Sequence, residues 1–171
     1  FPSFFKQVVQ DARRLTQCPL LARLDSAHDA VENRVDATAY GVDFIIKWNP
    51  RREDPEEWLE RAEMEGQWEE PREGKRVALF STYEELEVDG KEFRFRFVQR
   101  VTERKIDKTG QLLLIPEITL EGWSTSLDFP EAEVIELYED HGTSEQFHSE
   151  FKTDLDLERL PSGKFATNAL V

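Results

Sequence analysis

The 171-residue sequence has one cysteine and no long hydrophobic run. A lone Cys18 excludes an internal disulfide framework and any zinc site built from several cysteines. No apolar run approaches the ~18 residues that a membrane-spanning helix needs, so we expect no membrane partner. The sequence does not open with a secretory leader pattern, and together these features predict a cytoplasmic protein.

Basic residues are also few. The chain has 22 Lys and Arg against 36 Asp and Glu, which gives a formal net charge of −14. Such a balance works against DNA binding, because duplex affinity comes largely from Lys and Arg side chains that neutralise phosphates. The acids are unevenly placed, however, since residues 53–70 hold nine acidic residues and one basic residue. Without this segment the rest of the chain has a net charge near −6, which weakens the objection without removing it.

The chain begins at Phe1, has its only methionine at Met64 and ends at Val171 within an apolar stretch. We interpret it as an internal piece of a longer protein. With 39% hydrophobic residues it has enough apolar material for a core.

The first 49 residues alternate between helix and strand patterns. We expect a helix over 3–16, a strand over 20–24, a helix over 27–40 and a strand over 42–48. Apolar residues at helical spacing predict one buried stripe on the first helix, formed by Phe5, Val8, Val9, Ala12 and Leu15. Strand, helix and strand joined by short connections form a parallel crossover unit, which makes this part α/β.

The middle of the chain changes character. Residues 51–75 are highly charged and predict a short helix plus an irregular surface segment. Strand patterns then follow one another, with the turn Asp89-Gly90 as the clearest hairpin feature. The expected strands cover 77–83, 84–88, 92–101 and 112–120. This region predicts an antiparallel β insertion, after which the chain returns to helix.

Two segments resemble one enzyme family. Tyr138, His141, Glu145 and Lys152 have the spacing Tyr-x2-His-x3-Glu-x6-Lys. With Arg in place of the His, this is the Tyr-Arg-Glu-Lys signature of bacterial insertion-sequence DDE transposases. The segment CPLLARLDSAHDAVEN, which contains Asp25, is similar to the segment of the family's second catalytic Asp. The resemblance covers residues 18–49 and 119–171.

The resemblance implies an α/β fold in which a partial ribonuclease H-like core is interrupted by an antiparallel β-rich insertion. Residues 1–49 would form the first part of the core, and residues 50–127 the acidic segment and the insertion. Residues 128–171 would be the helical return that carries the catalytic Glu. The separation of 120 positions between Asp25 and Glu145 agrees with such an insertion.

The resemblance also implies a metal-dependent active site. Asp25 and Glu145 would be catalytic and would bind Mg²⁺ or Mn²⁺, since hard cations prefer oxygen ligands. The family's first Asp lies on a strand upstream, whereas the only acid before Asp25 is Asp11, in a helical pattern. We therefore expect this chain to be inactive alone. From the residues themselves, Asp25 also suits a helix N-cap, and Glu145 and Lys152 also suit a solvated helix face.

Several residues are candidates for DNA contacts. By resemblance, Lys152 and Tyr138 would lie near the cut DNA, as would His141, although a neutral imidazole binds phosphate poorly. Trp123 would stack on a flipped base, or else is buried by packing.

The strand KEFRFRFVQR places Phe93, Phe95 and Phe97 on one face and its arginines on the other, because strand side chains alternate. These arginines, Arg94, Arg96 and Arg100, either contact DNA phosphates or pair with nearby acids.

The expected partners are double-stranded DNA, as transposon ends and target, and a second copy assembled on it. The expected location is the bacterial cytoplasm, in association with the nucleoid. Two alternatives remain. One is a noncatalytic remnant or domain that acts only in DNA-end or protein binding. The other is a structure-specific nuclease of the same superfamily, which would have no reason to carry the long β insertion.

Overall fold

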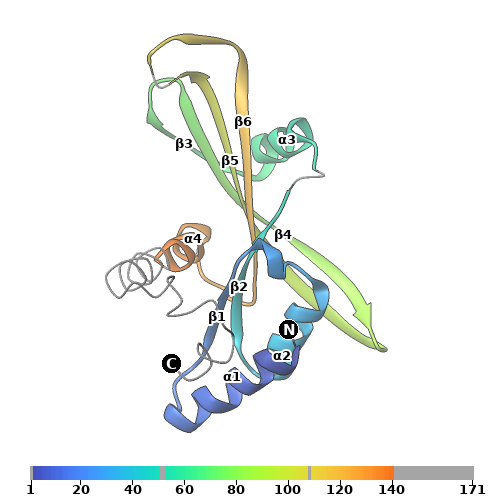
Figure 1. Cartoon of the computed structure of the whole chain (residues 1–171). Helices are drawn as coiled ribbons and strands as arrows, with labels where there is room; N and C mark the ends of the chain where they lie inside the picture. Colours follow the sequence, from blue (N-terminus) through green and yellow to red (C-terminus); the bar gives the residue numbers. More distant parts are fainter. Residues whose placement is uncertain (1, 51–52, 108, 141–171) are drawn as a thin grey trace, which may run out of the picture. The chain divides into compact units, whose positions relative to one another are not determined.

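The computed structural model describes residues 2–50, 53–107 and 109–140. The chain divides into two compact units, Phe1–Glu136 and Leu137–Val171. The described part of the second unit is the end of helix α4 and one following residue. In chain order the elements are α1 (Pro2–Leu15), β1 (Leu21–Leu24), the 3-10 turn η1 (Ser26–His28), α2 (Val31–Ala39), β2 (Asp43–Trp48), α3 (Pro55–Glu65), β3 (Gln67–Arg72), β4 (Lys75–Val88), β5 (Lys91–Ile106), β6 (Leu112–Thr125) and α4 (Glu131–Glu139) (Figure 1).

The strands form one six-stranded mixed sheet in the order β1-β2-β6-β5-β4-β3. β1 and β2 are parallel and joined through α2, so the predicted crossover unit and the α/β class are confirmed. Every other neighbouring pair is antiparallel, as predicted for the middle of the chain. β2 pairs with the end of β6, from Ile45 opposite Thr125 to Trp48 opposite Gly122. The parallel unit and the antiparallel strands therefore belong to one sheet.

The β4–β5 hairpin is longer than the sequence predicted. β4 runs without a break from Lys75 to Val88, so the predicted division between Tyr83 and Glu84 is wrong. The hairpin turns at Asp89 and Gly90, whose φ angles are 51° and 74°. Two successive positive φ angles match the right-handed twist of the flanking strands, which confirms the predicted Asp-Gly turn.

Two other elements differ from the prediction. The expected helix over 27–40 is divided into η1 and α2, because Ala30 is extended at φ −142° and Asn33 donates a hydrogen bond to the His28 carbonyl at 2.7 Å. Strand β3 was expected to be irregular, yet Trp68 pairs opposite Ala78 of β4. The β3 sequence QWEEPR hides its strand character, because it is an exposed edge strand with one apolar anchor.

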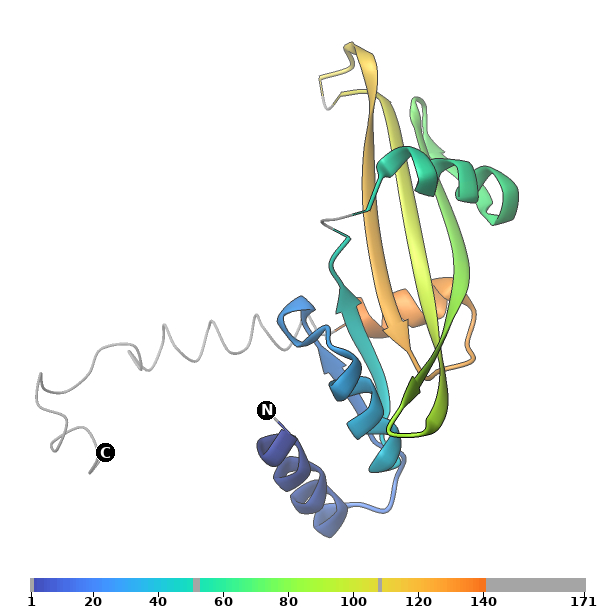
Figure 2. The same ribbon diagram turned by 90° about the vertical axis from the view of Figure 1, so that its right-hand side faces the viewer.

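Two apolar clusters lie on the sheet face that bears Phe97 and Val101. In the first, α1 and α2 pack on β2 and β5. In the second, Trp58 and Ala62 of α3 pack on β4 and β5, and Figure 2 shows α3 (teal) lying across these strands. Trp48 joins the clusters, because its ring stacks on Trp58 at 5.0 Å between centroids.

Gly122 makes room for Trp48. A Cβ at Gly122 would lie 2.5 Å from Cε3 of the Trp48 ring, which is closer than side chains tolerate. The close approach of strand and indole therefore needs a residue without a side chain.

The predicted stripe on α1 is only partly buried. Phe5 and Val9 are buried against the first cluster. Val8 and Leu15 are 46% and 88% exposed, so the prediction is wrong for these two. The helix rests on one narrow edge, where Phe5 meets Tyr40 at 6.2 Å between ring centroids. None of the described helices is long and apolar enough to cross a membrane.

Candidate functional site

Asp25 directly follows β1, and its carboxylate is exposed. Its Oδ1 accepts a hydrogen bond from the backbone N–H of Ala27 at 3.0 Å. Asp25 is thus the N-cap of η1, which confirms the capping alternative. One oxygen in a single hydrogen bond leaves a carboxylate with most of its acceptor capacity, so a cap and a cation ligand are compatible.

The acids around Asp25 have other partners. Asp29 forms an ion pair with Arg34, a buried residue of α2. The Arg34 Nε also donates to the Ser124 hydroxyl at 3.1 Å. Arg34 therefore holds α2 to the sheet and pairs with Asp29, whereas Asp25 has no ion pair within the described ranges.

The other expected metal ligand, Glu145, lies outside the described residues, as do His141 and Lys152. Within the part that the structure describes, no group of three His, Cys, Asp or Glu side chains is arranged to hold a metal ion. A close approach of Asp25 and Glu145, to within about 5–9 Å, stays a prediction. Tyr138 lies in the last turn of α4 and is half-buried.

Trp123 lies inside β6 rather than beyond the last strand. Its side chain is 0% exposed, so in this structure the ring offers no open face to a nucleobase. The Nζ of Lys47 lies 3.9 Å from a Trp123 ring centroid, and the Arg100 guanidinium lies at 5.1 Å. Of the two alternatives for Trp123, burial by packing is the one that this structure shows.

Arg100 and Lys47 share one carboxylate. The Arg100 Nε donates to Glu121 at 2.8 Å, and the Lys47 Nζ donates to it at 2.9 Å. Burial alone would raise the pKa of Glu121, but the hydrogen bond from Lys47 and the charge of Arg100 outweigh it and lower that pKa below its ordinary value. Both cations are partly exposed, with 26% of the Lys47 side chain and 25% of the Arg100 side chain accessible.

Arg96 is largely buried and is not available to a phosphate. Its side chain is 11% exposed and pairs with Glu131 at 2.8 Å. Arg94 is the most exposed of the three, and its guanidinium carbon lies 4.1 Å from the Tyr83 ring centroid. Each arginine therefore has an acidic partner, while DNA contact stays a prediction for the more exposed Arg94 and Arg100. The opposite face carries the buried Phe95 and Phe97, as predicted.

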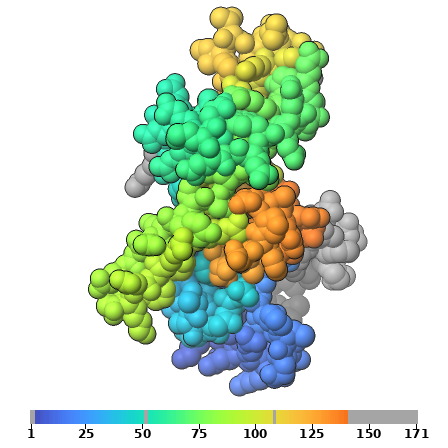
Figure 3. Space-filling view, turned by 180° about the vertical axis from the view of Figure 1, so that it is seen from behind, coloured from blue at the N-terminus to red at the C-terminus, as the bar shows by residue number. Residues whose placement is uncertain are grey.

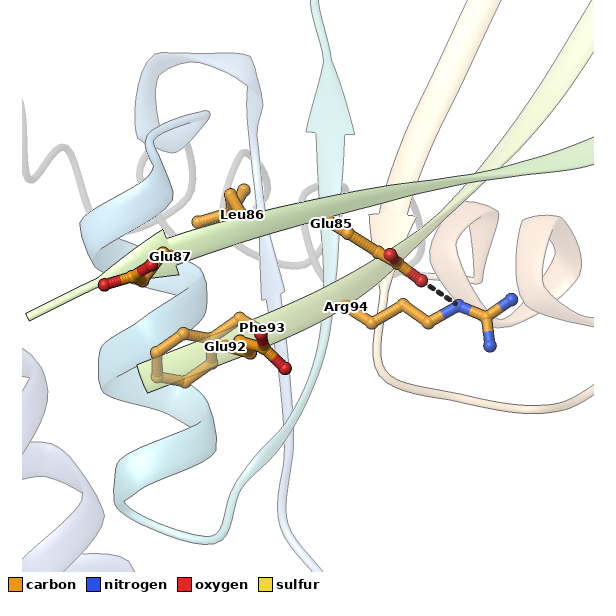
Figure 4. Close-up of a pocket in the computed structure, with 6 residues that line it drawn as sticks. All are labelled: Glu85, Leu86, Glu87, Glu92, Phe93 and Arg94. Atoms are coloured by element: carbon orange, nitrogen blue, oxygen red, sulfur yellow. Dashed lines mark ion pairs between the residues drawn. The ribbon is translucent and has the colours of Figure 1, made fainter. Parts of the chain in front are cut away.

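The tip of the β4–β5 hairpin has a pocket of about 360 Å³ (Figure 4). Arg94 reaches Glu85 across the strands at 3.7 Å. Glu87 and Glu92 lie directly opposite each other in the ladder. With three carboxylates and one guanidinium, this pocket disfavours a phosphate. It is lined by Glu85, Leu86, Glu87, Glu92, Phe93 and Arg94.

A second pocket, of about 340 Å³, lies where α2 and α3 approach the sheet. Arg34 and Arg61 line it from the helices, and Gln99 lines it from β5. Gln99 is 2% exposed, and its Oε1 has no hydrogen-bond partner among the described residues. Sequence reasoning missed this residue, although a polar Gln between the apolar Val98 and Val101 stands out in the strand pattern.

The comparisons with known proteins add no assignment. No protein-family model and no curated protein matches this sequence. A function must therefore be argued from the residues and their placement.

Proposed function

We propose that this chain is the C-terminal part of the catalytic domain of a DDE transposase, built on a ribonuclease H-like core. The observation that carries the proposal is the position of Asp25. It is an exposed carboxylate at the carboxyl end of a parallel strand, in a strand–helix–strand unit. Ligands of open α/β sheets bind beyond the carboxyl ends of their strands.

The proposed reaction is cleavage and strand transfer of transposon ends. Asp25 and Glu145 would hold Mg²⁺ or Mn²⁺, together with the family's first Asp. Two such ions about 3.5–4 Å apart activate the attacking oxygen and stabilise the leaving oxygen of an in-line displacement. Lys152 would hold a phosphate near the cut as a point charge.

The structure changes which residues we assign to DNA. Arg96 and Trp123 are removed from the proposed contacts because they are buried. Arg94 and the Arg100–Lys47 pair remain, because these cations are partly exposed. Double-stranded DNA is the proposed partner, with a homodimer assembled on it, in the bacterial cytoplasm.

The decisive experiment measures strand cleavage of transposon-end DNA by the full-length protein. Asp25→Asn should abolish cleavage while keeping the helix cap, since Asn caps as well as Asp. Glu145→Gln should do the same, because each ~1.4 kcal/mol of lost transition-state stabilisation costs tenfold in rate. Glu32→Gln, at an exposed position of α2, is the matched control and should cleave normally. Near-normal cleavage by Asp25→Asn or Glu145→Gln would contradict the assignment of that residue as a catalytic metal ligand.

A second candidate is a noncatalytic remnant that binds only DNA ends or a protein. It is favoured by the use of Asp25 as a cap. The encoding DNA separates the two. Flanking inverted repeats and an upstream strand with an Asp would support the transposase, and a short intact gene with neither would support the remnant.

A further inference from the structure

Arg96 contacts residues of the neighbouring strand β4 and of the connection between β6 and α4. Its Nη1 donates to the carbonyl oxygens of Leu127 and Phe129, at 3.1 and 2.6 Å. Its Nε donates to the Ser81 hydroxyl at 2.9 Å, and its Nη2 donates to Oε1 of Glu131 at 2.8 Å. The Ser81 hydroxyl in turn donates to the same Glu131 oxygen at 2.7 Å. A single guanidinium thus joins β5, β4, the connection after β6 and the first residue of α4.

The start of this connection is fixed as well. The Thr125 hydroxyl donates to the Phe44 carbonyl at 2.8 Å, and the Ser126 hydroxyl donates to Asp43 at 2.9 Å. Residues 127–131 are then the stretch whose path Arg96 determines. The first turns of α4 lie against β4, as Figure 3 shows (orange on green).

The other two arginines of this face make different contacts. Arg94 meets Glu85 of the neighbouring strand at 3.7 Å and is 61% exposed. Arg100 meets Glu121 of the neighbouring strand. Among the three, Arg96 alone donates to main-chain carbonyls of the β6–α4 connection in the hydrogen bonds of the described residues. Carbonyl oxygens have no formal charge to neutralise. These two hydrogen bonds therefore fix the backbone position of the β6–α4 connection rather than balance charge.

We infer that Arg96 is a positioning residue, which sets where α4, the helix that bears Tyr138 of the resembled signature, leaves the sheet. The inference rests on the proposed function for its catalytic consequence. The planar guanidinium is suited to this task, because it offers five donors in a rigid fork. A lysine offers one point charge, which can pair with Glu131 but cannot hold all four acceptors at once.

The first test uses this chain and does not depend on its function. In Arg96→Gln, hydrogen exchange of amides over 127–136 should accelerate by roughly tenfold or more, because local opening becomes easier. The Val134 amide, which bonds to the Pro130 carbonyl at 3.1 Å, is the principal reporter. The matched control Arg94→Gln should leave these amides unchanged. Unchanged exchange in Arg96→Gln would overturn the inference.

The second test uses the full-length protein on transposon-end DNA. Arg96→Gln should lower the cleavage rate by roughly tenfold to a hundredfold, as a misplaced group does, with an unchanged Kd for DNA. Arg96→Lys should recover part of the rate. A weaker Kd with a smaller salt slope would instead show a phosphate contact, and a normal rate would show no positioning role.

The two tests separate the inference from the proposed function. If the wild type does not cleave, the proposed function fails, while hydrogen exchange still decides whether Arg96 fixes the connection. If Arg96→Gln does not fold, Glu131→Gln removes the charged acceptor while leaving the carbonyl contacts. Glu131→Gln should then accelerate amide exchange over 127–136 by less than Arg96→Lys does. A larger acceleration in Glu131→Gln than in Arg96→Lys would overturn the inference.

Discussion

At the residue scale, several polar side chains serve the fold at positions where the sequence offered a functional interpretation. Arg96 and Trp123 are examples, since one is held by four acceptors and the other is fully buried. Asp25 differs, because its structural task occupies one oxygen and leaves the carboxylate exposed. Its capping and its charge can therefore be separated by substitution.

The first prediction makes that separation in this chain. Asp25→Ala should lower the free energy of unfolding by about 0.5–1 kcal/mol through loss of the cap. Asp25→Asn should leave the melting temperature nearly unchanged, because its amide oxygen still accepts the bond from Ala27. Both variants should lose the same Mn²⁺ affinity in calorimetric titration. Equal stability of the two variants would contradict the capping role.

The second prediction concerns Glu121 and pH. Its folded pKa lies below the ordinary 4.5, so its carboxylate stabilises the fold above that pH and loses this contribution as the pH falls through the folded pKa. The difference in melting temperature between wild type and Glu121→Gln should therefore shrink between about pH 6 and pH 3. Glu60→Gln, at an exposed position of α3, should show no such trend. A constant difference would argue against the ion pairs with Lys47 and Arg100.

At the element scale, the β4–β5 hairpin combines a favourable turn with an unfavourable charge pair. Asp89 and Gly90 suit the turn, but Glu87 and Glu92 face each other directly across the strands. Like charges at such positions destabilise a sheet by a fraction of a kcal/mol. This arrangement is tolerated because both side chains are exposed to water.

The third prediction follows from this pair. Glu87→Lys should raise the free energy of unfolding by about 0.5 kcal/mol, because it places a cation opposite Glu92. Glu85→Lys is the matched control, since it places a cation opposite Arg94 and should be neutral or destabilising. Chemical denaturation measures both. Stabilisation by both variants would show that net charge, rather than the cross-strand pair, controls the effect.

At the scale of the whole molecule, the net charge of −14 opposes binding to a polyanion. Two of the acid-rich elements, α3 and β3, lie at consecutive positions in the chain, and their acids are mostly exposed. Asp11, the one acidic residue that precedes Asp25 in the printed sequence, lies in α1.

The fourth prediction concerns the isolated chain. It should bind duplex DNA weakly and with steep salt dependence, bind Mg²⁺ or Mn²⁺ weakly, and not cleave DNA. Fluorescence anisotropy at several salt concentrations and a cleavage assay with Mn²⁺ would check this. Robust metal-dependent cleavage by this chain alone would show that the site has been misplaced.

The fold was predictable where local rules agree with the tertiary environment. The apolar run Phe44-Ile45-Ile46 of β2 matches its burial, and Asp89-Gly90 encodes its own turn. β3 was not predictable, because an edge strand of charged residues shows its strand character only by pairing with β4. For the candidate site, the place of Asp25 after β1 and its N-cap role followed from the sequence, whereas the contacts of Arg96 with the β6–α4 connection did not.

The sequence by itself determined the α/β class, the parallel crossover, the hairpin turn and the candidate carboxylates, because these depend on residues close together in the chain. Only the tertiary structure decided which charged side chains form ion pairs with one another. Arg96 and Glu131 are 35 residues apart, and Lys47 and Glu121 are 74 apart. Such pairs form because the sheet brings distant strands into register, and no local pattern of Arg or Glu records which partner it will meet.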